Sequence, residues 1–118
     1  MNILNLMFEI LINIKHAHLM TTSNAEHVAT DKLYDSFTKL YDKLLEVYIG
    51  KYGREKIKVT GKSSMVNINA YNGDIKSYLQ LVIKKMDTIV SKQDSEIQNI
   101  IDDIKNTIYH SIYMLSLQ

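Results

Sequence analysis

The stretch of sequence that decides the fold is SNAEHVATDKLYDSFTKLYDKLLEVYIG, residues 23–50. Its apolar side chains recur at steps of three and four residues, which is the period of one face of an α-helix. They are Leu33, Phe37, Leu40, Tyr41, Leu44 and Tyr48. Ser23 and Glu26 have the spacing of a capping box, in which the serine hydroxyl accepts from a first-turn N–H and the glutamate reaches back. With Gly50 or Gly53 placed to end it, this stretch predicts one long amphipathic helix.

Three further segments have the same helical period. The apolar positions of the first segment are Ile3, Leu4, Met7, Ile10, Leu11 and Ile14, in line with His18. Those of the third are Ile75, Leu79, Val82, Met86 and Ile89, and those of the fourth are Ile97, Ile100, Ile101, Ile104, Ile108, Ile112 and Leu115. Asp94 is placed to cap the fourth segment, but residues 91–94 contain no Gly or Pro, so one continuous helix is an alternative. Four such helices predict an all-α four-helix bundle.

Residues 51–71 form the one long segment without helical periodicity. Residues 57–59 alternate apolar with charged, and residues 65–68 are rich in β-prone side chains. A short hairpin around Thr60 and Gly61 is therefore an alternative to an irregular connection between the second and third helices.

The composition excludes several classes of function. The chain has 118 residues, the size of one domain, so we assign residues 1–118 to a single domain. It contains no Cys, which excludes disulfides and cysteine-ligated metal clusters. It also lacks a Gly-x-Ser-x-Gly motif and a phosphate-binding Gly-rich loop, so nucleophilic catalysis has no support. Its 14 basic and 13 acidic residues balance, which argues against a purely electrostatic nucleic-acid binder.

The first fifteen residues are apolar enough to raise the question of a signal peptide. They lack a basic leading region, and Asn5, Glu9 and Asn13 interrupt the apolar run. No stretch approaches the ~18 apolar residues of a membrane helix. We therefore expect a cytoplasmic protein without membrane contact.

One face of the second helix concentrates acids and an imidazole. At about 100° per residue, His27, Asp31, Asp35, Asp42 and Glu46 fall within an arc of roughly 100°, nearly opposite the apolar stripe. A solvated face is the simplest interpretation, but lysines sit to its flanks. Carboxylates with a neutral imidazole suit a hard or borderline divalent cation. Because this face points away from the chain's own core, a metal bound there needs ligands from another chain.

The same residues resemble a known family. The stretch Lys15-His16-Ala17-His18, then Glu26-His27, Asp31, Asp42 and Glu46, followed by Gly50 and Gly53, looks like the ferroxidase signature of the Dps-type mini-ferritins. The resemblance covers about residues 4–53. It implies a ferritin-like four-helix bundle that assembles into a hollow shell through its first and second helices. Its iron site lies across a two-fold interface, with histidines from one chain and carboxylates from its neighbour.

The resemblance also assigns roles to individual residues. His18, His27, Asp31, Asp42 and Glu46 match the metal ligands of the family. The implied function is oxidation and sequestration of Fe(II), as single or paired ions or as another divalent cation, in a homo-oligomer that protects against stress.

Two alternatives come from other classes of protein. One is a non-enzymatic helical bundle with an interaction or structural role, of viral or phage type, that carries a vestigial metal site. The other is a DNA-binding module that uses basic residues of the 51–62 segment. These are Lys51, Arg54, Lys56, Lys58 and Lys62.

Overall fold

The computed structural model describes residues 3–57, 71–89 and 93–117. They form four α-helices and one short 3-10 helix: α1 (Ile3–Met20), α2 (Asn24–Tyr52), η1 (Arg54–Ile57), α3 (Ile75–Ile89) and α4 (Ser95–Leu115). No strand occurs in the described residues, and the prediction of an all-helical bundle is confirmed. The hairpin proposed around Thr60 and Gly61 lies outside the described residues.

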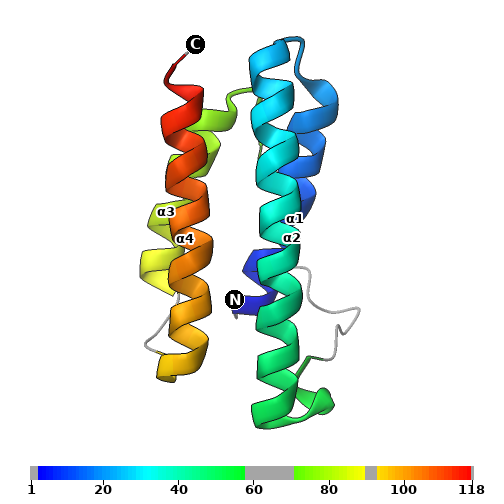
Figure 1. Cartoon of the computed structure of the whole chain (residues 1–118), viewed down its shortest axis with the longest axis vertical. Helices are drawn as coiled ribbons and strands as arrows, with labels where there is room; N and C mark the ends of the chain where they lie inside the picture. The colour runs from blue at the N-terminus through cyan, green and yellow to red at the C-terminus, as the bar shows by residue number, and fades with distance from the viewer. Residues whose placement is uncertain (1–2, 58–70, 90–92, 118) are drawn as a thin grey trace.

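The four helices pack around one core, and two helices that follow each other in sequence run in the same direction. In Figure 1, α1 runs toward the end of the bundle where the chain finishes, α2 runs away from it, α3 runs in the same direction as α2, and α4 returns. α1 packs on α2 and α3, and α4 packs on the same two helices. η1 and the start of α3 therefore lie at opposite ends of the bundle, so the connection between them is a single long crossover (Figure 1).

The core consists of the apolar positions that the sequence spacing identifies. Burial of these side chains is the main contribution to the stability of the bundle. Fully buried members include Leu6, Met7, Ile10, Ile14, Leu33, Phe37, Leu44, Leu79, Met86, Ile97, Ile101 and Ile104. Leu40, Tyr41 and Tyr48 pack against this core from partly buried positions.

The ends of α2 are fixed by the residues that the sequence indicates, with one difference. The Ser23 hydroxyl accepts from the Glu26 N–H at 3.2 Å, and Gly53 ends the helix while Gly50 lies inside it. Among the described residues, the Glu26 carboxylate makes no direct contact with the Ser23 N–H. The Thr21 hydroxyl instead accepts from that N–H at 3.1 Å and donates to the Glu26 carboxylate at 2.6 Å. Thr21 therefore links the Ser23 N–H to the Glu26 carboxylate, two groups that a capping box joins directly.

α3 and α4 are separate helices, so the alternative of one continuous helix is wrong. Asp94 occupies the N-cap position of α4, as predicted, but its side chain makes no capping hydrogen bond. Its carboxylate instead pairs with the Lys51 ammonium at 2.8 Å and accepts from the Tyr52 hydroxyl. Lys51 also pairs with Glu96. These contacts fasten the end of α2 to the start of α4.

Within the described ranges, no helix is both long and apolar enough to cross a membrane.

Candidate metal centre

Two histidines meet where α1 turns into α2. His18 lies in the last turn of α1 and His27 in the first turn of α2. Their rings stack with centroids 4.0 Å apart and 23° between the planes. The Nδ1 atom of His18 is 3.1 Å from the backbone carbonyl oxygen of His27, and the Nδ1 atom of His27 is 3.1 Å from that of His18. The contact is therefore reciprocal.

These carbonyl contacts determine which ring nitrogen carries the proton. A carbonyl oxygen only accepts, so each Nδ1 must donate, and in the neutral ring Nε2 is left with its lone pair. The Thr30 hydroxyl, 3.3 Å from His18 Nδ1, donates to the Glu26 carbonyl at 2.7 Å and can likewise accept from His18. Metal-ligating histidines are commonly held in this way, with the second ring nitrogen bound to a carbonyl. The pair thus presents two imidazoles in a form able to bind a cation.

The predicted carboxylate ligands are exposed on α2. Asp31 follows His27 by one turn, and Asp42 and Glu46 follow three turns later on the same face. At 1.5 Å per residue, Asp42 lies about 16 Å along the helix from Asp31. One ion therefore cannot be shared by both ends of this face within one chain.

The described part of the chain contains no group of three or more His, Cys, Asp or Glu side chains able to hold a metal ion. The fold brings His18 and His27 together but leaves Asp42 and Glu46 far along the helix from them. Asp31, Asp42 and Glu46 form no ion pair with described residues. A site that uses all five residues needs a second copy of the chain.

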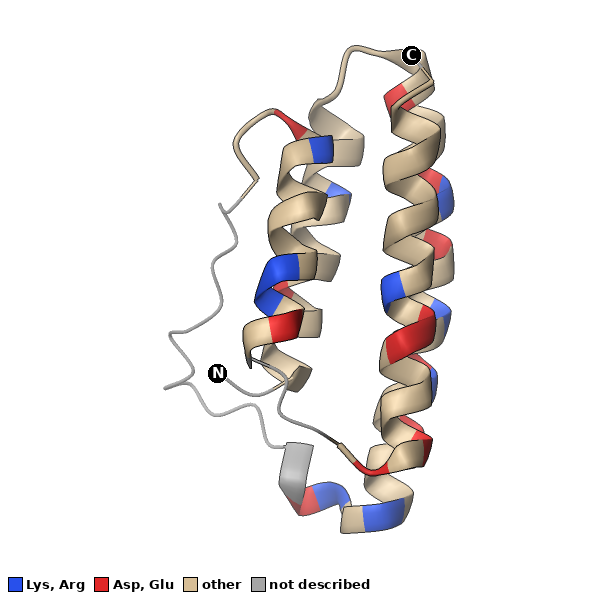
Figure 2. Ribbon diagram, turned by 90° about the vertical axis from the view of Figure 1, so that its left-hand side faces the viewer, with Lys and Arg blue, Asp and Glu red and all other residues tan. Residues whose placement is uncertain are grey.

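Within the described helices, the charged residues do not single out another face. Acidic and basic positions are mixed along the helices in Figure 2. Of the basic residues in the DNA-binding alternative, Lys51 is already paired with Asp94 and Glu96. The side chains of Lys56, Lys58 and Lys62 lie outside the described part.

A buried polar cluster was not predicted. Glu9 is 1% exposed, and its carboxylate lies 3.5 Å from the ammonium of Lys85 on α3. The buried Asn13 donates to the Glu9 carbonyl at 2.8 Å and accepts from the Tyr71 N–H at 2.8 Å. Burial, and then the nearby Glu9 charge, raise the pKa of Tyr78. The cluster fixes the segment leading into α3 against α1.

The signal for this cluster was present in the sequence. Asn5, Glu9 and Asn13 are spaced by four residues, so they lie along one side of a helix. We interpreted them as interruptions of an apolar run, although their period matches that of the core positions beside them.

Comparison with known proteins places the chain in a family. A model described as a family of unknown function, DUF5856, matches residues 18–115. An uncharacterized 14.6 kDa protein from the mobD–ri intergenic region of Enterobacteria phage T4 is 30% identical over 102 residues, which cover 86% of this chain and 76% of the phage protein. No solved structure matches the chain. The family model spans both candidate histidines and three of the four helices in full, and the chain belongs to the DUF5856 family.

Proposed function

We propose that two copies of this protein bind Fe(II), or a similar divalent cation, between their α2 helices and oxidise it. The proposal includes a ferritin-like bundle of the Dps type that sequesters the ferric product. It rests on the register of the candidate ligands along α2.

The spacing of the candidate ligands along α2 fits a two-fold interface between two copies of the helix. Consider two antiparallel α2 helices related by an axis at the level of residues 36 and 37. His27 then lies opposite the partner's Glu46, and Asp31 lies opposite the partner's Asp42, because both pairs are equidistant from the axis in sequence. The same interface creates a second, identical site, as isologous contacts do. One register therefore unites ligands that are about 16 Å apart in a single chain.

The topology supports the ferritin-like part of the proposal. Up-down bundles with short loops have antiparallel sequential neighbours, whereas ferritin-like bundles contain one long crossover. Here α2 and α3 run in the same direction (Figure 1), so the single crossover falls between the second and third helices.

Oxidation of bound Fe(II) is favoured when the site stabilises Fe(III) more strongly than Fe(II). Carboxylates of Asp31, Asp42 and Glu46 place negative charge around the bound ion, and this stabilises the higher oxidation state more strongly. His27 and His18 supply neutral nitrogen ligands through Nε2. With dioxygen as the oxidant, four Fe(II) ions would each give up one electron, and these electrons with four protons would reduce one dioxygen to two water molecules. The ferric product would then be stored.

The test combines oligomeric state with iron oxidation. We expect analytical ultracentrifugation to show a symmetric oligomer, and Fe(II) addition in air to produce growing near-ultraviolet absorbance. Asp31→Asn and Glu46→Gln should each reduce the initial rate at least about tenfold, and Asp103→Asn, an exposed acid on α4, should not. A monomer, or equal rates in all variants, would contradict the proposal.

A second candidate is a non-enzymatic interaction or structural protein. The observation favouring it is the lack of any single-chain metal group in the described residues. It predicts an oligomer or a bound partner whose stability is unchanged by divalent cations and by their chelation.

A further inference from the structure

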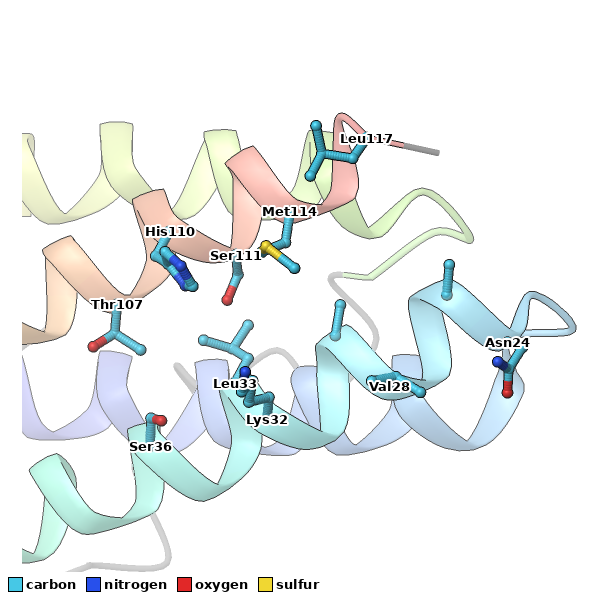
Figure 3. A pocket seen from close by; sticks show the side chains of 12 residues that line it. Asn24, Val28, Lys32, Leu33, Ser36, Thr107, His110, Ser111, Met114 and Leu117 are labelled. Carbon is cyan, nitrogen blue, oxygen red and sulfur yellow. The ribbon is translucent and has the colours of Figure 1, made fainter.

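A groove separates the first half of α2 from the last half of α4. Its volume is about 550 Å³, which is within the range of small-molecule sites, and such sites often lie between the helices of bundles. Ala29 and Leu33 line it from α2, and Ser111 and Met114 line it from α4 (Figure 3). Neither His18 nor His27 lines the groove, so it is distinct from the candidate metal centre.

Large apolar side chains lie toward one end of the groove, where Asn24 is also placed, and the other polar side chains lie toward the opposite end (Figure 3). Val28, Met114 and Leu117 lie toward the end of the bundle where α2 begins (Figure 3). These three side chains are 57%, 40% and 62% exposed. Large apolar side chains gathered in this way on a surface mark a binding region.

The polar end contains a hydroxyl without a partner. Ser111 is 7% exposed and points across the groove toward α2 (Figure 3). Its hydroxyl forms no hydrogen bond with the residues that the structure describes. Thr107, one turn earlier, donates to the Asp103 carbonyl at 3.0 Å. The Ser111 oxygen is not among the buried unpaired side-chain oxygens of the described residues. It is therefore accessible from the groove and can form a hydrogen bond with a polar group that enters.

The charged residues that line the groove indicate whether the polar group of a ligand is anionic or cationic. Lys32 on α2 and His110 on α4 lie on the two sides of the polar end (Figure 3). No Asp or Glu is among the described residues that line the groove. Lys32 forms no ion pair with any described residue. An anionic head is therefore favoured over a cationic one.

We propose that this groove binds an anionic amphiphile of the fatty-acid class. The head accepts from Lys32 and from the Ser111 hydroxyl, and the hydrocarbon chain lies along Val28, Met114 and Leu117. The groove extends over α2 residues 24–36, about 18 Å of helix, so a linear chain fits it better than a compact ring system. The site uses one chain and does not depend on the proposed metal chemistry.

The first test is ligand selectivity in the intact protein. Dodecanoate, below its micellar concentration, should bind with a stoichiometry of one per chain in isothermal titration calorimetry. Dodecylammonium has the same chain and the opposite charge, and should bind about tenfold more weakly or worse. Absence of saturable dodecanoate binding, or equal affinity for the two amphiphiles, would overturn the proposal.

The second test is a set of variants with a matched control. Lys32→Glu should raise the dissociation constant about tenfold, and Ser111→Ala should raise it severalfold. Lys39→Glu makes the same charge change at an exposed position of α2 outside the groove, and should have no effect. Equal loss of affinity in Lys32→Glu and Lys39→Glu would show attraction to the net charge and not a site.

A third variant tests the occupied volume. Ala29→Phe should fill the groove and abolish binding, with retained helicity confirmed by circular dichroism. If this variant does not fold, Val28→Glu, at an exposed position of the apolar end, should weaken binding instead. Self-association of the wild type that either variant abolishes, without dodecanoate binding, would assign the groove to a second copy and overturn the proposal.

Discussion

His18 and His27 each direct Nδ1 to the backbone carbonyl oxygen of the other, at 3.1 Å in both directions. The pair therefore connects the last turn of α1 to the first turn of α2 whether or not a cation is bound. A structural role and a ligand role are compatible in these residues, because they use different nitrogens of the same rings.

The structural role predicts coupled losses of stability. His18→Ala and His27→Ala should each lower the free energy of unfolding by about 1 kcal/mol, since each removes a hydrogen bond and the stacking contact. The double variant should lose less than the sum of the two, because either change removes the shared contact. Urea denaturation measures all three values. His110→Ala, at an exposed position on α4, is the control, and strict additivity would contradict the reciprocal contact.

The two glycines near the end of α2 predict opposite effects. Gly53 has φ +89° and ψ 158°, a region that is almost closed to other residues, so Gly53→Ala should destabilise by about 1–3 kcal/mol. Gly50 lies inside the helix, and Gly50→Ala should stabilise by about 0.5–1 kcal/mol. An added Cβ meets nothing within 4 Å at either position. Thermal unfolding should therefore shift in opposite directions, and a shared direction would contradict the assigned end of α2.

The buried carboxylate predicts a difference between two adjacent lysines. Lys85→Met should destabilise by about 1–3 kcal/mol, because it removes a partner from Glu9 in the interior. Lys84→Met, at the exposed neighbouring position, should be nearly neutral. Adding Glu9→Leu to Lys85→Met should recover part of the loss, since a buried pair replaced by apolar groups is often no less stable. Chemical denaturation of the four proteins tests this, and equal effects at Lys84 and Lys85 would contradict it.

The contacts of Lys51 predict a pH dependence. Its hydrogen bonds lower the pKa of Asp94 and of Glu96 below their ordinary values of 3.8 and 4.5. Carboxyls with a depressed pKa in the folded state contribute stability above the unfolded-state pKa, and this is lost as the pH falls through the folded-state pKa. Below about pH 4.5, the free energy of unfolding of Lys51→Gln should therefore fall less steeply with decreasing pH than that of the wild type. Above that pH the two curves should have nearly the same shape.

Salt provides the control for that experiment. The three side chains are exposed, so their attraction is screened in concentrated salt. The difference between wild type and Lys51→Gln should shrink between low salt and 1 M sodium chloride. A difference that persists unchanged would point to lost packing of the lysine stem.

The apolar core was predictable because its period is a local property. Leu33, Phe37 and Leu44 are spaced for one helix face, and all three are buried. Asp94 was placed correctly before α4 for a similar reason, since residue type and position along the chain define an N-cap. Its bonding was not predictable, because Lys51 and Tyr52 reach it from another helix.

Contacts with residues outside the local motifs account for the other differences. Glu26 was expected to close the capping box directly, but Thr21, just outside the motif, takes the Ser23 N–H. Burial of Glu9 depends on Lys85, which lies 76 residues further along the chain. The stacking of His18 on His27 depends on how the three residues between α1 and α2 turn. The five-residue metal site stays a prediction, since it needs a second chain.

The common direction of α2 and α3 has a consequence for folding. α1 with α2, and α3 with α4, are close in sequence and can pair through local contacts. Contacts of α1 with α3, and of α2 with α4, close only when these two hairpins dock across a long sequence separation. Because such closure is the slow step in small domains, changes at the seam between α2 and α4 should slow folding more than equally destabilising changes in the α1–α2 turn.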